Sequence, residues 1–307
     1  MKKSLLVCVA ISLAAMSAPG QVTLKHKLVE GEKITYETKL RMKQTISIDG
    51  AEFTTSNRQT VVVSMQMGKR DKNGLLPCDC AIAHLKTTLS LPGSIEIAFD
   101  SEKPDTEMTD PRFEPIMNAL RASAKLKYRQ VYGKNDRVIS VTGSESILKT
   151  LDPTTAALLK DQINAEYLKM ATNQDLDQIP GKPVKKGDKW QRKRKMQLGS
   201  GQTMKIDSEY EYLGTVQHKG KTLHKIKSVA REVSYEQDPA ARSQWKVTSS
   251  DLGIETLEGA MYFDQEAGRI CEAYNKSRIS GDMKMLIQGQ EKECRLDLFI
   301  SADTSTK

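Results

Sequence analysis

Two stretches of the chain carry the same landmarks around long extended segments, and this repetition is the strongest constraint on the fold. Each stretch opens with a glycine, an acid, a lysine and a large apolar residue, first at 31–34 and again at 187–190. Each ends in a glycine-led segment that closes with Phe-Asp, at 93–100 and at 259–264. Self-similarity at a comparable spacing predicts two versions of one structural module.

The segments inside these modules have the composition of strands. Residues 60–67 are rich in β-branched side chains, a polar turn follows at 70–74, and residues 75–89 return as a partner strand. Residues 208–213 and 222–234 repeat the arrangement. Long strands joined by short turns form large curved antiparallel sheets. We therefore predict an α+β fold that is mainly antiparallel β, with two related curved sheets, each resembling a half-barrel, covered by a few amphipathic helices.

Helix signals are few and lie between the strands. Asp110 and Pro111 begin one helix, whose apolar stripe includes Phe113 and Met117. Asp152-Pro153 begins a longer helix expected to run to about Thr172. These helices are expected to cover the concave sheet faces. The predicted organisation is a signal peptide at 1–20, a first β-rich module at 21–144, a helical connector at 145–179 and a second β-rich module at 180–307.

The first residues of the chain have the order of a cleavable secretory signal. Lys2 and Lys3 precede an apolar run, and small residues follow at 17–20. We place the cleavage after Gly20, so that the mature chain starts at Gln21. No later stretch approaches the ~20 consecutive apolar residues that a transmembrane helix needs. We expect an exported protein that does not span the membrane and is periplasmic or extracellular after cleavage.

The composition limits the partners of such a protein. Its net charge of +8 is mildly basic, which outside the cytoplasm favours contact with anionic envelope components and argues against nucleic acid. Aromatic residues make up only 5% of the chain, too few for a platform that stacks sugars or single-stranded bases. No cofactor motif is present, and the paired carboxylates lie in polar segments where nothing raises a pKa, so we expect no enzyme.

Four cysteines follow the signal, an even number that favours disulfides in an oxidising compartment. Cys271 and Cys294 lie in neighbouring strand candidates, and we predict a bond between them. No metal site is predicted. Cys78, Cys80 and His84 come nearest to one, because a regular strand would turn all three to one face, but a fourth ligand is missing and oxidation competes for the thiols.

A basic segment opens the second module. Residues 182–195 hold eight basic residues and one acid around Trp190, which is expected in the core. The segment is either an anion-binding surface or a solvated edge strand whose lysines discourage strand addition. As an anion-binding surface it would use Lys185, Lys186, Lys189, Arg192 and Arg194.

Two motifs carry a resemblance to a known family. The run Pro180-x-x-Pro-Val-x-x-Gly-Asp-x-Trp190 and the strand Gly259-x-x-x-Phe-Asp264 resemble an uncharacterised family of secreted bacterial proteins, a domain of unknown function. That family assigns no catalytic residues. The layout is also similar to the half-barrel of periplasmic lipoprotein carriers, which implies helices lining a concave sheet.

Three functions remain open at this point. The first is an exported, non-enzymatic envelope protein that binds a lipid or other apolar or amphipathic ligand between sheet and helices. Its predicted ligand-binding residues are the apolar side chains on the inward stripes, Phe113, Met117, Leu159, Ile163, Met283 and Met285. The second is a structural or assembly factor that recruits an anionic envelope partner through the segment at 182–195. The third is a metal-handling protein.

Overall fold

The computed structural model describes residues 20–103, 110–199, 201–237 and 245–307. The predicted signal peptide therefore lies outside the described residues, except for Gly20. Long antiparallel strands dominate the described part, with three α-helices and two 3-10 helices between them. The elements are β1 (Gln21–Thr23), β2 (Lys33–Ile48), β3 (Ala51–Met67), β4 (Leu76–Leu91), β5 (Ile95–Asp100), η1 (Pro111–Phe113), α1 (Glu114–Ala124), β6 (Lys127–Tyr132), β7 (Val138–Thr142), η2 (Ser144–Thr150), α2 (Pro153–Ile163), α3 (Ala165–Leu176), β8 (Pro183–Lys185), β9 (Lys189–Gly199), β10 (Gln202–His218), β11 (Lys221–Gln237), β12 (Trp245–Asp264), β13 (Arg269–Ile287) and β14 (Gln290–Thr306).

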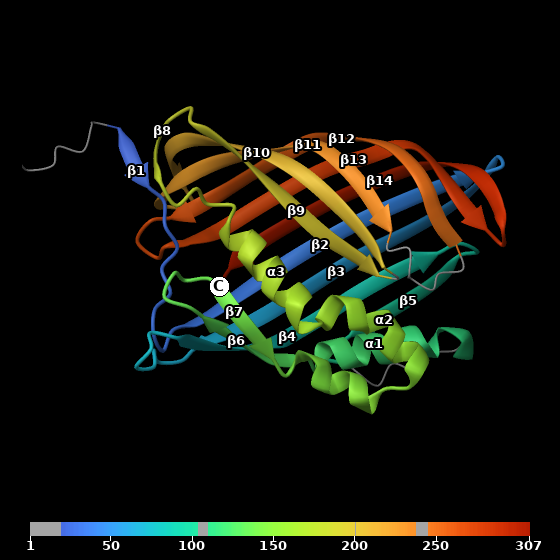
Figure 1. The fold of residues 1–307 in the computed structure, drawn as a ribbon, viewed down its shortest axis with the longest axis horizontal. Helices are drawn as coiled ribbons and strands as arrows, with labels where there is room; N and C mark the ends of the chain where they lie inside the picture. The colour runs from blue at the N-terminus through green and yellow to red at the C-terminus, as the bar shows by residue number, and fades with distance from the viewer. Residues whose placement is uncertain (1–19, 104–109, 200, 238–244) are drawn as a thin grey trace, which may run out of the picture.

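Twelve of the strands form one open, strongly curved antiparallel sheet (Figure 1). Its order is β7-β6-β4-β3-β2-β14-β13-β12-β11-β10-β9, with β5 paired to β4, while β1 and β8 form a separate small sheet. The predicted class, mainly antiparallel β with curved sheet and few helices, is confirmed. The strands of the two expected modules share a single sheet, however, because β2 pairs with β14 from Tyr36 to Ile48.

The sheet folds back over part of its own concave face. β11 pairs with β12 only between His224 and Lys227, and beyond this point its far half bends away together with β9 and β10. The bent strands cross the concave side in Figure 1. Met204 of β10 then packs in one buried cluster with Ile279 and Met283 of β13. This sheet-on-sheet contact supplies a core that no helix covers.

The repeated sequence landmarks adopt the same local structure. Gly31 and Gly187 both have positive φ, 73° and 92°, at the turn that precedes a long strand. In each turn the carbonyl of the following acid accepts a backbone hydrogen bond, from Met67 at 2.8 Å and from Tyr212 at 3.0 Å. The two strands that these turns introduce, β2 and β9, lie in different halves of the sheet.

The first predicted helix begins at its capping residue, whereas the second predicted helix is divided into two. Asp110 caps η1 by accepting a hydrogen bond from the Arg112 amide, and α1 follows directly. The long helix expected after Asp152 is two helices, because Asn164 leaves helical geometry with ψ 148°. Its side chain accepts a hydrogen bond from the Tyr167 amide at 2.8 Å and caps α3. Asparagine favours this position over a helix interior, which explains the break.

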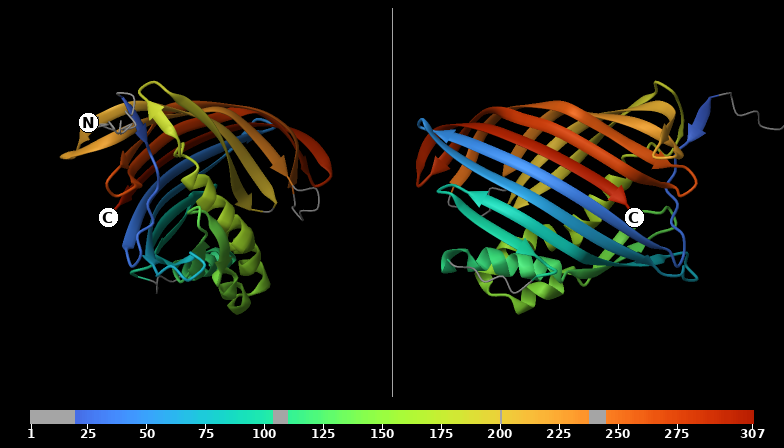
Figure 2. Two further views of the ribbon diagram at one scale, coloured as in Figure 1. Left: turned by 60° about the vertical axis from the view of Figure 1, so that its left-hand side comes forward. Right: turned by 180° about the vertical axis from the view of Figure 1, so that it is seen from behind.

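The helices lie together on the concave side, between the two edges of the sheet (Figure 2). α1 packs on β4 and β5, α2 packs on α1 and β9, and α3 contacts β7 and β9. Met117 of α1 is fully buried against Leu85, Ile97 and Phe99. The helices thus cover the sheet near its edges and leave the inner face of the middle strands to other contacts.

Candidate ligand-binding face

The concave face of the middle strands is a broad apolar surface that retains partial exposure. Direct cross-strand pairs share a face, so Ile46 of β2 lies between Leu296 of β14 and Phe53 of β3. Phe53 is 47% exposed. The half-buried apolar residues packed against this region are Met42, Ile46, Ile48, Met196, Ile206, Val233, Val247, Leu252, Ile254, Ile287 and Ile300. These side chains pack against the buried cluster between the folded halves of the sheet and keep part of their surface exposed.

Polar side chains interrupt the apolar surface on β2, β3 and β4. Gln44 of β2 lies opposite Thr55, and Asn57 lies opposite Leu89. The hydroxyl of buried Thr87 donates a hydrogen bond to Oδ1 of Asn57 at 3.0 Å. Beyond this polar row, a second apolar cluster continues beneath α1. The inner face therefore offers both apolar contacts and hydrogen-bonding groups.

α3 crosses the concave side and ties the two sheet edges together. The Asn173 amide donates to the carbonyl of Val138 and accepts from its N–H, both at 2.9 Å, on the edge strand β7. The neighbouring Gln174 makes the same two kinds of contact with Lys195 on the opposite edge, β9. These amides satisfy backbone groups that an edge strand otherwise leaves open.

No residue of α3 is itself buried, although the helix contacts both edges. Asp175 at its C-terminal end pairs with Arg194 of β9 at 2.8 Å, and Asp177 pairs with Arg137 beside β7. Helices that fill a core bury an apolar stripe. α3 instead joins the two edges near its C-terminal end, and its half-buried Ala165, Leu168 and Leu176 pack against a buried cluster of the sheet.

The six residues predicted to bind ligand fall in three separate clusters. Met283 and Met285 of β13 lie in the cluster between the folded halves of the sheet. Leu159 and Ile163 of α2 are 6% and 5% exposed and pack against alanines of α1. Met117 and half-buried Phe113 belong to a third cluster on β4 and β5. Each cluster thus contains two of the six predicted residues, which are near neighbours in the sequence. All six side chains contact other residues of the protein.

The apolar residues on β2 and β3 were missed by the sequence analysis. Residues 40–48 alternate with apolar side chains at Leu40, Met42, Ile46 and Ile48. This period-2 pattern is typical of a half-buried strand, and it could have predicted that these residues share one face. Phe53 carries no such signal, since its place on the inner face depends on the register between β2 and β3.

The predicted anion-binding segment at 182–195 makes many contacts within the chain. Lys189 pairs with Glu209 at 3.2 Å, Arg194 pairs with Asp175, and the Arg192 guanidinium donates to the carbonyl of Asp177 at 2.6 Å. Lys185 and Lys186 are exposed. Trp190 is 7% exposed and stacks on Tyr210, so its predicted place in the core is confirmed.

His84 does not share a face with Cys78 and Cys80, so the three-residue set considered for a metal is wrong. The pairing of β3 with β4 shifts by one residue between Ile82 and His84, which turns His84 to the convex face. There Nε2 of His84 lies 2.9 Å from Oδ1 of Asp100, and Glu102 stands nearby. The His84 contact and the Glu102 amide hold the pKa of the Asp100 carboxyl at about 2.

The predicted Cys271–Cys294 disulfide is also wrong. Both residues lie on adjacent strands as expected, but Cys294 pairs opposite Met283, twelve positions from Cys271 along β13. At about 3.4 Å per residue the two thiols are roughly 40 Å apart, far beyond the reach of a disulfide. All four cysteines of the described ranges are free.

We expect peptide mapping under non-reducing conditions to find Cys271 and Cys294 in unlinked peptides. The separation along β13 forbids the bond, so a reducing agent should leave the unfolding temperature of a Cys78→Ala, Cys80→Ala double variant unchanged. Differential scanning calorimetry with and without the reductant measures this. A linked Cys271–Cys294 peptide would contradict the register of β13 and β14.

Comparisons with known proteins concern the family and the fold. Within the described residues, no helix combines the length and apolar character needed to cross a bilayer. A comparison with curated proteins finds no match. The structure of lipovitellin, described as showing lipid-protein interactions, is 8% identical with a TM-score of 0.41; the match covers 90% of this chain but only 25% of that one.

Two bacterial structures match over more of their own length. An exported protein with a YmcC-like fold from Bacteroides fragilis is 10% identical, with 90% of this chain and 98% of that chain covered and a TM-score of 0.21. An outer membrane lipoprotein-sorting protein domain from Vibrio parahaemolyticus is 6% identical, with 85% and 83% covered and a TM-score of 0.12. At such identities a likeness extends no further than the fold.

A family model described as "Family of unknown function (DUF6263)" matches residues 78–224. The matched region runs from β4 through the helices to β11 and includes the motif at 180–190. Over residues 78–224 the chain is thus similar to this family of unknown function, in line with the resemblance that its sequence motifs carry.

Proposed function

We propose that this protein is exported and binds a lipid-like, apolar or amphipathic ligand on the concave face of its sheet, without catalysing a reaction. The observation that carries the proposal is the row of half-buried apolar side chains on β2, β12 and β14, which continues to the exposed ring of Phe53 on β3. Apolar surface that the protein itself leaves open favours an apolar ligand.

The polar row at Gln44, Asn57 and Thr87 supports an amphipathic ligand over a purely apolar one. Pockets for such ligands are mainly apolar with a few placed polar groups that fix orientation. The secretory signal at the start of the chain supports export, since Lys2 and Lys3 precede a short apolar run. Methionines such as Met42 and Met196 adapt to apolar shapes of more than one kind.

The proposal is tested by titrating the protein with dansyl-undecanoic acid and following the dansyl fluorescence. Phe53→Asp places a charge on the inner face beside Ile46, at a side chain exposed enough for the fold to tolerate the change. Losing the burial of one phenylalanine should raise the Kd at least about tenfold.

Leu286→Asp is the matched control, because Leu286 is 36% exposed on β13 and adjacent in sequence to inward-facing Met285 and Ile287. Alternation along the strand places it on the convex face. Its Kd should equal that of the parent. No binding by the parent, or an equal loss in both variants, would contradict a ligand site on the concave face.

A further inference from the structure

Two cysteines of β4 face two methionines of β3 in directly paired positions. The register of the two strands places Met65 opposite Cys80 and Met67 opposite Cys78. Residues two apart on a strand share a face, and direct pairs have Cβ atoms about 4.5 to 5.5 Å apart. Met67, Cys78 and Cys80 belong to one buried cluster, and half-buried Met65 packs against it. The pairing of the strands thus gathers four sulfur-bearing side chains at one place.

The two thiols are spaced as ligands of one metal ion would be. Sγ of Cys78 lies 3.8 Å from Sγ of Cys80. A metal bonded to both sulfurs at about 2.3 Å would have an S–metal–S angle of about 110°, close to the tetrahedral value. Cys78 and Cys80 are 0% and 2% exposed and Met67 is 2% exposed, so these three side chains are shielded from water, while Met65 is half-buried.

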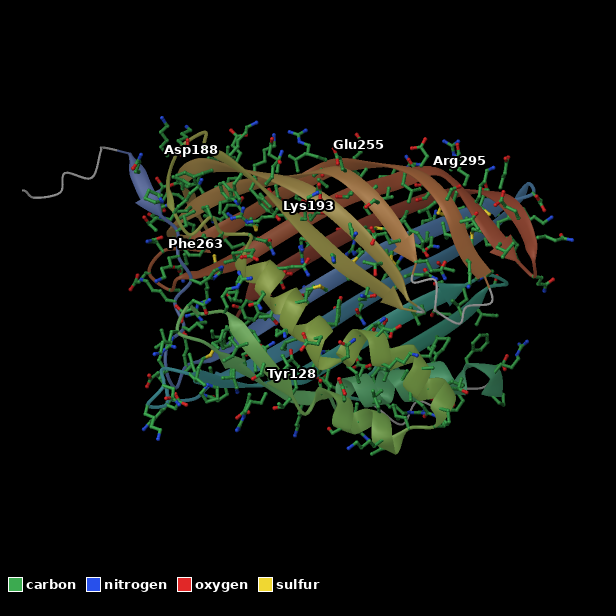
Figure 3. All side chains as sticks on the ribbon, in the orientation of Figure 1. Tyr128, Asp188, Lys193, Glu255, Phe263 and Arg295 are labelled. Atoms are coloured by element: carbon green, nitrogen blue, oxygen red, sulfur yellow. The ribbon has the colours of Figure 1, made fainter. Side chains whose placement is uncertain are left out.

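The surroundings favour a soft cation over a hard one. The cluster is lined by apolar and aromatic residues, including Tyr132 and Tyr128, the latter labelled in Figure 3. Thiolate and thioether ligands together select Cu(I), whereas Zn(II) takes thiolate and imidazole.

We propose that Cys78, Cys80, Met65 and Met67 form a binding site for one Cu(I) ion. The site lies on the concave side of β3 and β4, at the end of the sheet next to β6 and β7. Leu168 and Leu176 of α3 pack against the same cluster, although no residue of α3 is buried. These side chains of α3 therefore contribute to the cover of the sulfur cluster on the concave side. The site is distinct from the ligand-binding face around Ile46 and Phe53.

The experiment titrates reduced, anaerobic full-length protein against the bicinchoninate complex of Cu(I) and follows the loss of its colour. The parent should withdraw one equivalent of copper, and its X-ray absorption should report sulfur ligands. Cys78→Ala with Cys80→Ala should abolish this withdrawal. Met65→Leu with Met67→Leu keeps the apolar volume and should weaken binding at least about tenfold, because even indirect partners of a metal site cost 10- to 100-fold.

Matched controls separate the site from general thiol binding. Cys294→Ala with Met283→Leu removes a directly paired buried cysteine and methionine elsewhere in the sheet, and copper binding should be unchanged. His84→Ala should also leave it unchanged, since His84 lies on the convex face. Methionine variants that keep full affinity, or a control variant that loses it, would overturn the four-sulfur site. Circular dichroism confirms that each variant is folded.

Discussion

Replacing Leu159 by alanine is expected to lower the free energy of unfolding by about 2 to 5 kcal/mol, the range for truncation in a packed core. Leu159 is 6% exposed and packs in the cluster that joins α2 to α1, together with Ala119, Ala122 and Ile163. Alanine would leave a cavity between α2 and α1. Urea unfolding followed by circular dichroism measures the change.

Leu158 provides the control, because it is the neighbouring residue of the same helix and is 46% exposed. Leu158→Ala changes the same number of atoms and should stay within about 0.5 kcal/mol of the parent. The comparison also decides what Leu159 contacts. A loss at Leu159 no larger than that at Leu158 would mean that it faces a ligand or solvent, contrary to its packing against α1.

The second large effect is expected at Gly281, where a side chain has no room. Gly281 has φ +153° and pairs with Leu252 of β12. A Cβ at this position would lie 2.0 Å from the carbonyl oxygen of Asp251. Because the Cβ is bonded to the backbone of β13 and the oxygen belongs to the backbone of β12, neither can move aside without breaking the pairing of the strands. Gly281→Ala should cost about 2 to 5 kcal/mol, combining overpacking with backbone strain.

Gly253 lies next to this position on the paired strand and gives the opposite expectation. It pairs with Ser280, and the nearest atom to its Cβ would be the Ser280 carbonyl oxygen at 3.8 Å, an ordinary contact. Gly253→Ala should leave the stability unchanged or raise it by up to about 1 kcal/mol, because the unfolded chain loses freedom. Thermal unfolding compares the two variants. Equal losses at Gly281 and Gly253 would show that the clash is not the cause.

The local features of this fold were predictable, and those that depend on register were not. The strand pattern at 60–67, the caps at Asp110 and Asp152 and the buried Trp190 follow from side-chain chemistry over a few residues. The break at Asn164 was predictable too, since asparagine is a preferred N-cap, although one helix was expected from Pro153 to about Thr172.

The errors have one physical origin, because a sequence does not state which residue lies opposite which. Cys271 and Cys294 are on adjacent strands, yet their positions along the ladder separate them. A single irregularity before His84 reverses the face that follows it. The position of Met65 opposite Cys80 also depends on the register between β3 and β4. The candidate sites are therefore products of strand alignment more than of any motif.

The pairing of β2 with β14 has a consequence for how the chain reaches this structure. Thr38 and Thr304 share a hydrogen bond although they are 266 residues apart in the sequence. Such contacts raise the contact order, and proteins rich in them fold slowly. A long loop must lose conformational entropy before the contact forms and stabilises the structure. Until β14 is in place, one side of β2 remains an open template for strand addition. The pairing of β2 with β14 is thus the folding step that competes most directly with aggregation.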